Sequence, residues 1–197
     1  MRAAASNRPV FAALTALAAL AVAVSAAGCG IRPTSVPVSA RSAPARAECA
    51  PGGPSPAGSP ADGETLRPVY LVCGRQLAPV PRGVPDDVTG AELAARLLAE
   101  LTREPSDDER EAGYSTAVAG LRVVDGRSGD PAGTVRLSRD PQTLGSPVLA
   151  QLVCTYAVGE DRTAVLAGPE EGDEPYAYRC TDEVIRTPDS TVGEPAA

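Results

Sequence analysis

The reactive side chains of this sequence are mainly its five cysteines, because other common catalytic groups are missing. The 197-residue chain has no histidine, and all 18 of its basic residues are arginine, so it also lacks lysine. Imidazole bases, Schiff-base lysines, P-loop lysines and zinc sites with histidine ligands are therefore excluded. No two cysteines have the C-x-x-C spacing of a thioredoxin-like motif or a four-cysteine zinc site. We therefore expect neither a metal nor a cofactor. The cysteines are Cys29, Cys49, Cys73, Cys154 and Cys180.

The first of these cysteines follows a segment typical of bacterial secretion signals. Two arginines precede an uninterrupted apolar run over residues 10–24, which is too short to span a bilayer comfortably. The small residues Ala27 and Gly28 stand directly before Cys29, as in a lipobox. In that motif the cysteine receives diacylglycerol and, with it, palmitate, and the leader (here residues 1–28) is removed. The alternative is ordinary secretion, with cleavage after Ala27 and an unmodified thiol at Cys29.

Composition and charge limit the remaining possibilities. Residues 29–66 are rich in Pro, Ala, Gly and Ser, and they predict a flexible, disordered linker that extends from the lipid anchor. The net charge of −7 and the absence of basic clusters argue against nucleic-acid binding. The complete replacement of lysine by arginine is typical of a very GC-rich genome, as in actinobacteria.

The following segment has regular helix and strand signals. Thr89 and Glu92 form a T-x-x-E capping box before an apolar stripe, and Ser106 and Glu109 form a second box. Ser146 is expected to be the N-cap of a helix that runs to about residue 158. The predicted strands are 68–73, an edge segment 77–84, a hairpin of 121–124 with 135–137, and finally 163–167 and 176–180. This order predicts an α/β (α+β) fold, a two-layer sandwich with helices on one face of a mixed β-sheet.

The cysteines other than Cys29 allow three pairings, and export favours disulfides over buried free thiols. At about 100° per residue, Cys154 lies nearly opposite the apolar stripe of its predicted helix, so it faces away from the sheet. The C-terminal stretch that contains Cys180 is available to cover it. We therefore predict a Cys154–Cys180 bridge, which leaves Cys49 to pair with Cys73.

Three stretches of the predicted domain carry recognisable motifs: 69–82, 97–117 and 133–155. The second has a helix, a turn and the pattern E-R-x-x-G-x-x-T, and the third has an a-q-[LIV]-x-x-T helix. Together the three stretches resemble the GerMN module of sporulation and spore-germination proteins. The first six residues from Cys29 also resemble small actinobacterial lipoproteins with one such module.

This resemblance implies a GerMN-like domain over residues 67–187, followed by a disordered tail over 188–197. It also implies a non-catalytic module on the extracytoplasmic face of the cell membrane. The leading hypothesis is therefore a lipid-anchored interaction module of the cell envelope that has a protein partner. The alternative is a module that binds a small ligand or a cell-wall component in a pocket between the sheet and the first helices. The sequence does not indicate an oligomeric state.

Acidic residues provide the remaining candidates for chemistry. The acidic stretch 170–174 lacks the alternating spacing of a calcium loop, and Asp125 and Asp130 stand in turn-forming Asp-Gly and Asp-Pro pairs. A pair of carboxylates acting as a wall hydrolase is the third hypothesis, since only two acids are required. The shortage of aromatic residues, 3% of the chain, argues against a sugar-binding platform. We therefore expect that the protein is not an enzyme.

Overall fold

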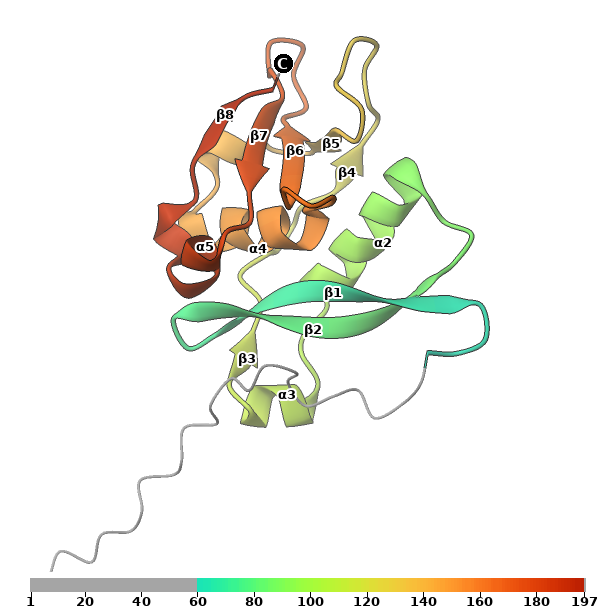
Figure 1. Cartoon of the computed structure of the whole chain (residues 1–197), viewed down its shortest axis with the longest axis vertical. Helices are drawn as coiled ribbons and strands as arrows, with labels where there is room; N and C mark the ends of the chain where they lie inside the picture. The colour runs from blue at the N-terminus through green and yellow to red at the C-terminus, as the bar shows by residue number, and fades with distance from the viewer. Residues whose placement is uncertain (1–59, 197) are drawn as a thin grey trace, which may run out of the picture. The chain divides into compact units, whose positions relative to one another are not determined.

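The computed structural model describes residues 60–196. The predicted signal peptide, the lipidation site Cys29 and the cysteine Cys49 lie outside these residues. No helix between residues 60 and 196 is both long enough and apolar enough to cross a membrane. The elements are β1 (Glu64–Cys73), β2 (Gln76–Pro85), α2 (Gly90–Thr102), α3 (Asp107–Glu111), β3 (Tyr114–Ser115), β4 (Val123–Val124), β5 (Val135–Leu137), η1 (Pro141–Thr143), α4 (Ser146–Tyr156), β6 (Thr163–Ala167), β7 (Tyr176–Arg179), α5 (Asp182–Arg186), η2 (Pro188–Ser190) and β8 (Gly193–Pro195) (Figure 1).

The strands form two sheets. The first is an antiparallel sheet of three strands in the order β2-β1-β3, dominated by the long β1–β2 hairpin. The hairpin turns at Gly74, whose φ of +65° favours glycine. The second sheet has five strands in the order β4-β5-β6-β7-β8, in which only the β5–β6 pair is parallel. Because parallel strands need a crossover, the chain between β5 and β6 contains α4.

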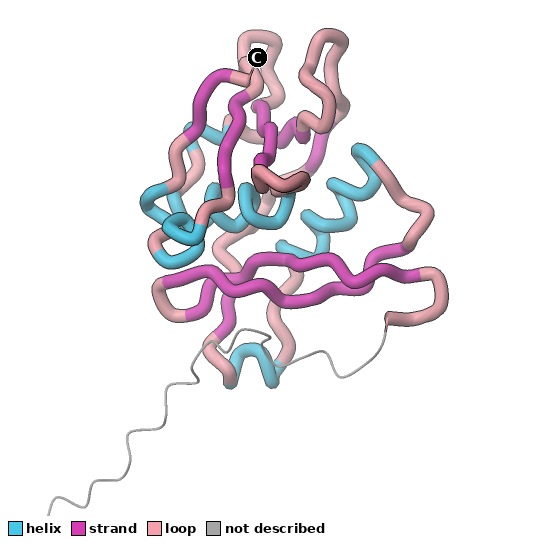
Figure 2. The backbone as a smooth tube through the Cα atoms, in the orientation of Figure 1, coloured by secondary structure: helices cyan, strands magenta, loops and turns pink. Residues whose placement is uncertain are grey.

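Helix α4 is the centre of the fold. Every residue from Leu149 to Tyr156 is buried, so the helix has no solvent-facing side over two turns. It contacts β1 of the first sheet, β6 and β7 of the second, and α2. In Figure 2 the helix lies between the hairpin and the five-stranded sheet. A helix that is apolar all round is typical of such a central position.

Prolines occupy one edge of the first sheet. The two-residue turn of the hairpin makes Cys73 and Gln76 its first hydrogen-bonded pair, and hydrogen-bonded pairs then alternate along β1 and β2. This register places Pro79, Pro81 and Pro85 at positions whose nitrogen faces away from β1. Since proline has no N–H group, most of the outer edge of β2 lacks donors for another strand. The sequence-based expectation of an edge strand here is confirmed.

The α+β class is confirmed, as are the strands of the predicted hairpin and the mixed character of the larger sheet. The strands nevertheless divide between two sheets, whereas we expected one. The reason lies at Tyr70, where side chains of α4 satisfy the backbone of β1. Strand β1 therefore packs across the helix and does not join the strands on its other side.

The boundaries of the domain need two corrections. Strand β1 begins at Glu64, inside the region predicted as linker, because residues 64–66 pair with β2. The predicted disordered tail contains η2 and β8, and β8 pairs with β7. Sequence periodicity could not reveal β8, because all three of its residues are exposed. The ring of Tyr178 lies so close to the backbone at Gly193 that any side chain at this position would clash with it, so a glycine is required.

The helix caps follow the prediction only in part. The capping box of α3 is confirmed: the Glu109 N–H donates to Ser106 Oγ at 3.3 Å, and the Ser106 N–H donates to Glu109 Oε2 at 2.9 Å. Helix α2 begins after Thr89 as predicted, but the Thr89 side chain makes no capping hydrogen bond. The prediction of Ser146 as N-cap is wrong by one residue, because Gly145 is the N-cap and Ser146 is already helical.

An arginine holds the loops at one end of the larger sheet. Arg136 in β5 is buried, and its guanidinium donates two hydrogen bonds to the carboxylate of Asp130, with lengths of 2.7 and 2.8 Å. It also donates to the Gly168 carbonyl at 2.7 Å. Hydrogen bonds from Arg136 lower the pKa of Asp130 to about 2, although burial of the carboxyl acts in the opposite direction. The predicted turn residue Asp130 is therefore an anchor for two loops.

The depressed pKa of Asp130 makes stability depend on pH. The contribution of the ionised Asp130 carboxylate to the free energy of unfolding is present above the unfolded pKa of about 3.9. It is lost as the pH falls towards the folded pKa near 2. We expect Asp130→Asn to lower the free energy of unfolding by about 2 kcal/mol at pH 7 and by almost nothing at pH 2. Urea titrations at pH 7, 4 and 2 measure this difference. Asp125→Asn in the same connection is the control, and an equal loss at both pH extremes contradicts the assignment.

Candidate functional site

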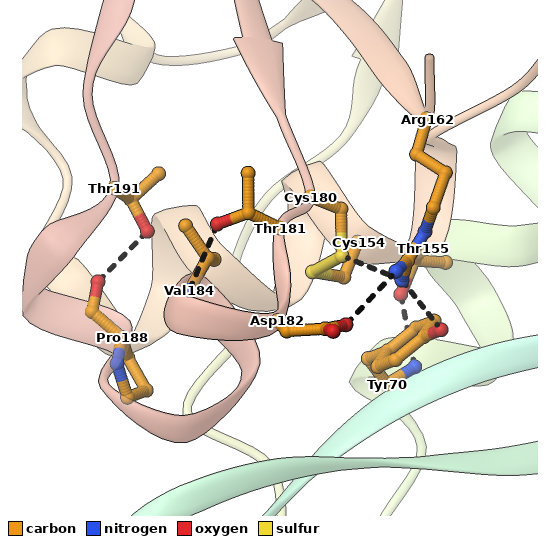
Figure 3. Close-up of a disulfide and its surroundings, with 10 residues drawn as sticks. All are labelled: Tyr70, Cys154, Thr155, Arg162, Cys180, Thr181, Asp182, Val184, Pro188 and Thr191. Carbon is orange, nitrogen blue, oxygen red and sulfur yellow. Dashed lines mark hydrogen bonds and ion pairs between the residues drawn. A yellow bond between two sulfur atoms is a disulfide. The ribbon is translucent and has the colours of Figure 1, made fainter. Parts of the chain in front are cut away.

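A buried disulfide joins α4 to the end of β7. Cys154 and Cys180 are bonded, with their Cα atoms 4.9 Å apart, and both residues are buried (Figure 3). The predicted Cys154–Cys180 bridge is therefore confirmed. Cys73 is buried in β1, and its pairing with Cys49 stays a prediction because Cys49 lies outside the described residues. No group of residues within 60–196 has the composition and arrangement of a metal site.

Arg162 lies beside the disulfide and connects three segments. Its Nη2 atom donates to Tyr70 Oη and to Cys180 Sγ, each at 3.1 Å, and its Nη1 atom is 3.7 Å from Asp182 Oδ1 (Figure 3). With a φ of +48°, it is the only non-glycine residue of the described chain in the left-handed region. That conformation costs about 1 kcal/mol or more. The cost is offset where the Arg162 carbonyl accepts the Cys180 N–H at 3.0 Å.

Two polar side chains of α4 bind the backbone of β1. The Tyr70 N–H donates to Thr155 Oγ1 at 3.0 Å, and the Tyr70 carbonyl accepts from Gln151 Nε2 at 2.9 Å. Gln151 is fully buried, and its Oε1 atom accepts the Ala117 N–H at 2.7 Å. Both residues belong to the a-q-[LIV]-x-x-T stretch, but we did not predict their role. Their one-turn separation on an otherwise apolar helix is the signal that indicates it.

A buried ion pair joins β2 to α3. Arg82 Nη1 and Nη2 lie 2.6 and 3.0 Å from the two carboxylate oxygens of Glu109. Burial raises the pKa of Glu109, but hydrogen bonds from Arg82 and the Ser106 N–H outweigh it, so that the pKa is lowered. The hydroxyl of the buried Tyr114 has no hydrogen-bond partner among the described residues. Its pKa is raised by burial and by the charge of Glu109.

These electrostatics bear on the hydrolase hypothesis. A glycosidase acid needs a carboxyl with a raised pKa. Within residues 60–196, both carboxyls with a shifted pKa, Glu109 and Asp130, are shifted downward by arginine. Their hydrogen bonds make them structural links, and neither carboxyl is available to a substrate.

The surface has an apolar groove between the two sheets. Its volume is about 220 Å³, and it lies between the start of β1, one face of α2, the end of α4 and the start of β5. An adjoining hollow of about 270 Å³ shares Gly133, Tyr156 and Val158 with it and contains Glu160 and Asp161. The residues lining the groove are Arg67, Pro68, Gly90, Leu93, Ala94, Leu97, Gly133, Val135, Thr155, Tyr156, Ala157 and Val158.

Comparison with known proteins gives a structural likeness. No protein-family model matches the chain, and no curated protein matches it. The structure is similar to the solved tandem GerMN domains of the sporulation protein GerM from Bacillus subtilis, with a TM-score of 0.43 and 16% sequence identity. The match covers 60% of this chain and 43% of the other, so this chain spans less than half of that structure. At this level of similarity, membership of the GerMN family stays a prediction.

Proposed function

We propose that the protein is a non-catalytic, GerMN-like binding module of the bacterial cell envelope, anchored by a lipid at Cys29 on the extracytoplasmic face of the membrane. Its partner is another envelope protein. The observation that carries this proposal is the buried Cys154–Cys180 disulfide. Disulfides persist mainly in oxidising compartments, which agrees with the secretion signal in the sequence. Two acyl chains at Cys29 provide stable anchoring.

The proposal of a non-catalytic role rests on the structural roles of the buried ionisable side chains. The buried arginines Arg82 and Arg136 and their carboxylate partners hold loops and helices together. A nucleophilic serine or threonine needs an activating base, and the chain has neither histidine nor lysine. We therefore expect the protein to act through binding surfaces and not through an active site.

The outer edge of β2 is a poor place for the partner to bind, because three of its outward positions are prolines. A partner that adds a strand needs backbone donors, which most of this edge lacks. The exposed faces of helices, the other strand edges and the groove beside α2 are the remaining surfaces for contact.

The anchor is tested by fractionating cells that produce the full chain. We expect the native chain in the membrane, where it partitions into detergent, and the Cys29→Ser chain without its lipid and released from the membrane fraction. Ser35→Ala, six residues beyond Cys29, is the control and is expected to behave as the native chain. Crosslinking of the native chain in membranes, followed by mass spectrometry, then identifies the partner. Recovery of the native chain in the cytoplasm, with Cys154 and Cys180 reduced, contradicts the proposal.

The second candidate function is binding of a small ligand. The observation that favours it is the groove of about 220 Å³ between β1, α2 and α4, the region where we expected a ligand pocket. Ligand binding predicts a ligand-dependent rise in melting temperature, whereas a protein partner is detected by crosslinking.

A further inference from the structure

The groove beside α2 has walls that suit an aliphatic chain. Leu93 and Leu97 stand one turn apart on α2 and face the groove together with Val135 at the start of β5. Val158 is 72% exposed, one of the few large apolar residues of the described chain that remain outside the core. An apolar ligand in the groove would remove these side chains from water.

One charge stands at the groove. Arg67 is the only charged residue among those that line it, in a chain with a net charge of −7. It pairs across the hairpin with Arg82, whose charge is neutralised by Glu109. Arg67 is exposed and has no ion pair with a described residue. Its guanidinium is therefore free to bind a carboxylate with two hydrogen bonds.

The hollow that adjoins the groove has the other sign. It contains Glu160 and Asp161 and shares its wall at Val158 with the groove. These carboxylates repel an anion from the side of the groove at Val158. An anionic headgroup is therefore directed to Arg67, and its apolar chain lies along the wall formed by α2.

We propose that this groove binds an aliphatic carboxylate, with the carboxylate at Arg67 and the chain against Leu93, Leu97, Val135 and Val158. This inference rests on the second candidate function and names its ligand class. Small-ligand sites commonly combine an apolar lining with a few polar groups that fix orientation. Here Arg67 has the orienting role.

The test uses the full mature chain with Cys29→Ser, so that neither lipid nor detergent competes for the probe. Sodium octanoate is titrated in a calorimeter, and amide NMR shifts locate its binding. We expect a Kd below about 1 mM, with shifts centred on 93–97 and 156–158. Octan-1-ol, which has the same chain without the charge, should bind about tenfold more weakly.

Matched variants separate the charge from the apolar wall. Arg67→Gln should weaken octanoate binding about tenfold and leave octanol unchanged, whereas Val158→Ser should weaken both. Arg75→Gln in the hairpin turn and Val192→Ser, at an equally exposed valine, are the controls and should bind as the native chain does. All four substitutions are at exposed residues, and circular dichroism confirms folding of each variant.

The proposal is overturned if octanoate does not bind at 10 mM, or if Arg67→Gln binds it as tightly as the native chain. Shifts confined to residues outside the groove overturn it as well. None of these outcomes affects membrane fractionation or partner crosslinking, so failure of the ligand assignment is distinguishable from failure of the proposed function.

Discussion

Replacement of both Cys154 and Cys180 by alanine is expected to lower the free energy of unfolding by about 3–4 kcal/mol. The bridge closes a loop with a sequence separation of 26, and its removal returns that conformational freedom to the unfolded chain. Urea titration followed by circular dichroism measures the loss. It should be visible both as a lower transition midpoint and as a lower melting temperature.

Chemical reduction gives an independent control for this result. In a strong reductant the native chain should lose at least as much stability as the double variant does, because reduction also breaks the predicted Cys49–Cys73 bridge. The double variant should lose only the contribution of that second bridge when it is reduced. The pair is buried, so reduction is expected only when the protein opens. A loss below about 1 kcal/mol in the double variant means that the bridge does not constrain the unfolded chain as the entropy model requires.

Breaking the buried Arg82–Glu109 pair is expected to have an equal or larger effect. Glu109→Gln leaves the Arg82 charge with only the more distant carboxylate of Glu100, 3.6 Å from Nε, in a site where the Arg82 and Glu109 side chains are less than 10% exposed. Removal of one member of a buried pair typically costs about 3–5 kcal/mol, much of it from the charge that remains. Equilibrium unfolding at pH 7 measures the loss.

A double-mutant cycle identifies the cause. Arg82→Met with Glu109→Gln removes the stranded charge, so the double variant should be more stable than the sum of the single losses predicts. The exposed Arg110–Asp107 pair is the matched control, and Asp107→Asn there should cost less than about 1 kcal/mol. Simple additivity of the Arg82 and Glu109 substitutions means that the two side chains do not interact as described.

Local signals in the sequence predicted much of the fold. The apolar run of β1, the stripe of α2 and the Ser106 capping box each depend on neighbouring residues, and the structure has all three elements. The division into two sheets depends on contacts between distant parts of the chain. Gln151 and Tyr70 are 81 residues apart, and no local pattern indicates that they bond. Contacts between distant residues therefore determine how the strands divide into sheets, which the local periodicity of the sequence does not specify.

The candidate sites were predictable to different degrees. The Cys154–Cys180 bridge was predicted correctly from the angular position of Cys154 opposite the apolar stripe. The expectation that this side of the helix faces away from any sheet was wrong, because α4 lies between two sheets and Cys180 directly follows β7. The groove was expected only as a region between strands and the first helix. The role of Arg67 could not be predicted, because residue 67 was placed at the boundary of a linker. Its position became clear only when β1 was seen to begin at Glu64.

The complete burial of α4 from Leu149 to Tyr156 has a consequence for the dynamics of the molecule. Because one helix supplies a packing surface to both sheets, neither sheet keeps its apolar face covered if the other separates from it. The amide hydrogens of α4 then exchange with solvent only in rare, global openings, and both sheets lose their protection in the same event. We therefore expect residues 60–196 to open as a single cooperative unit.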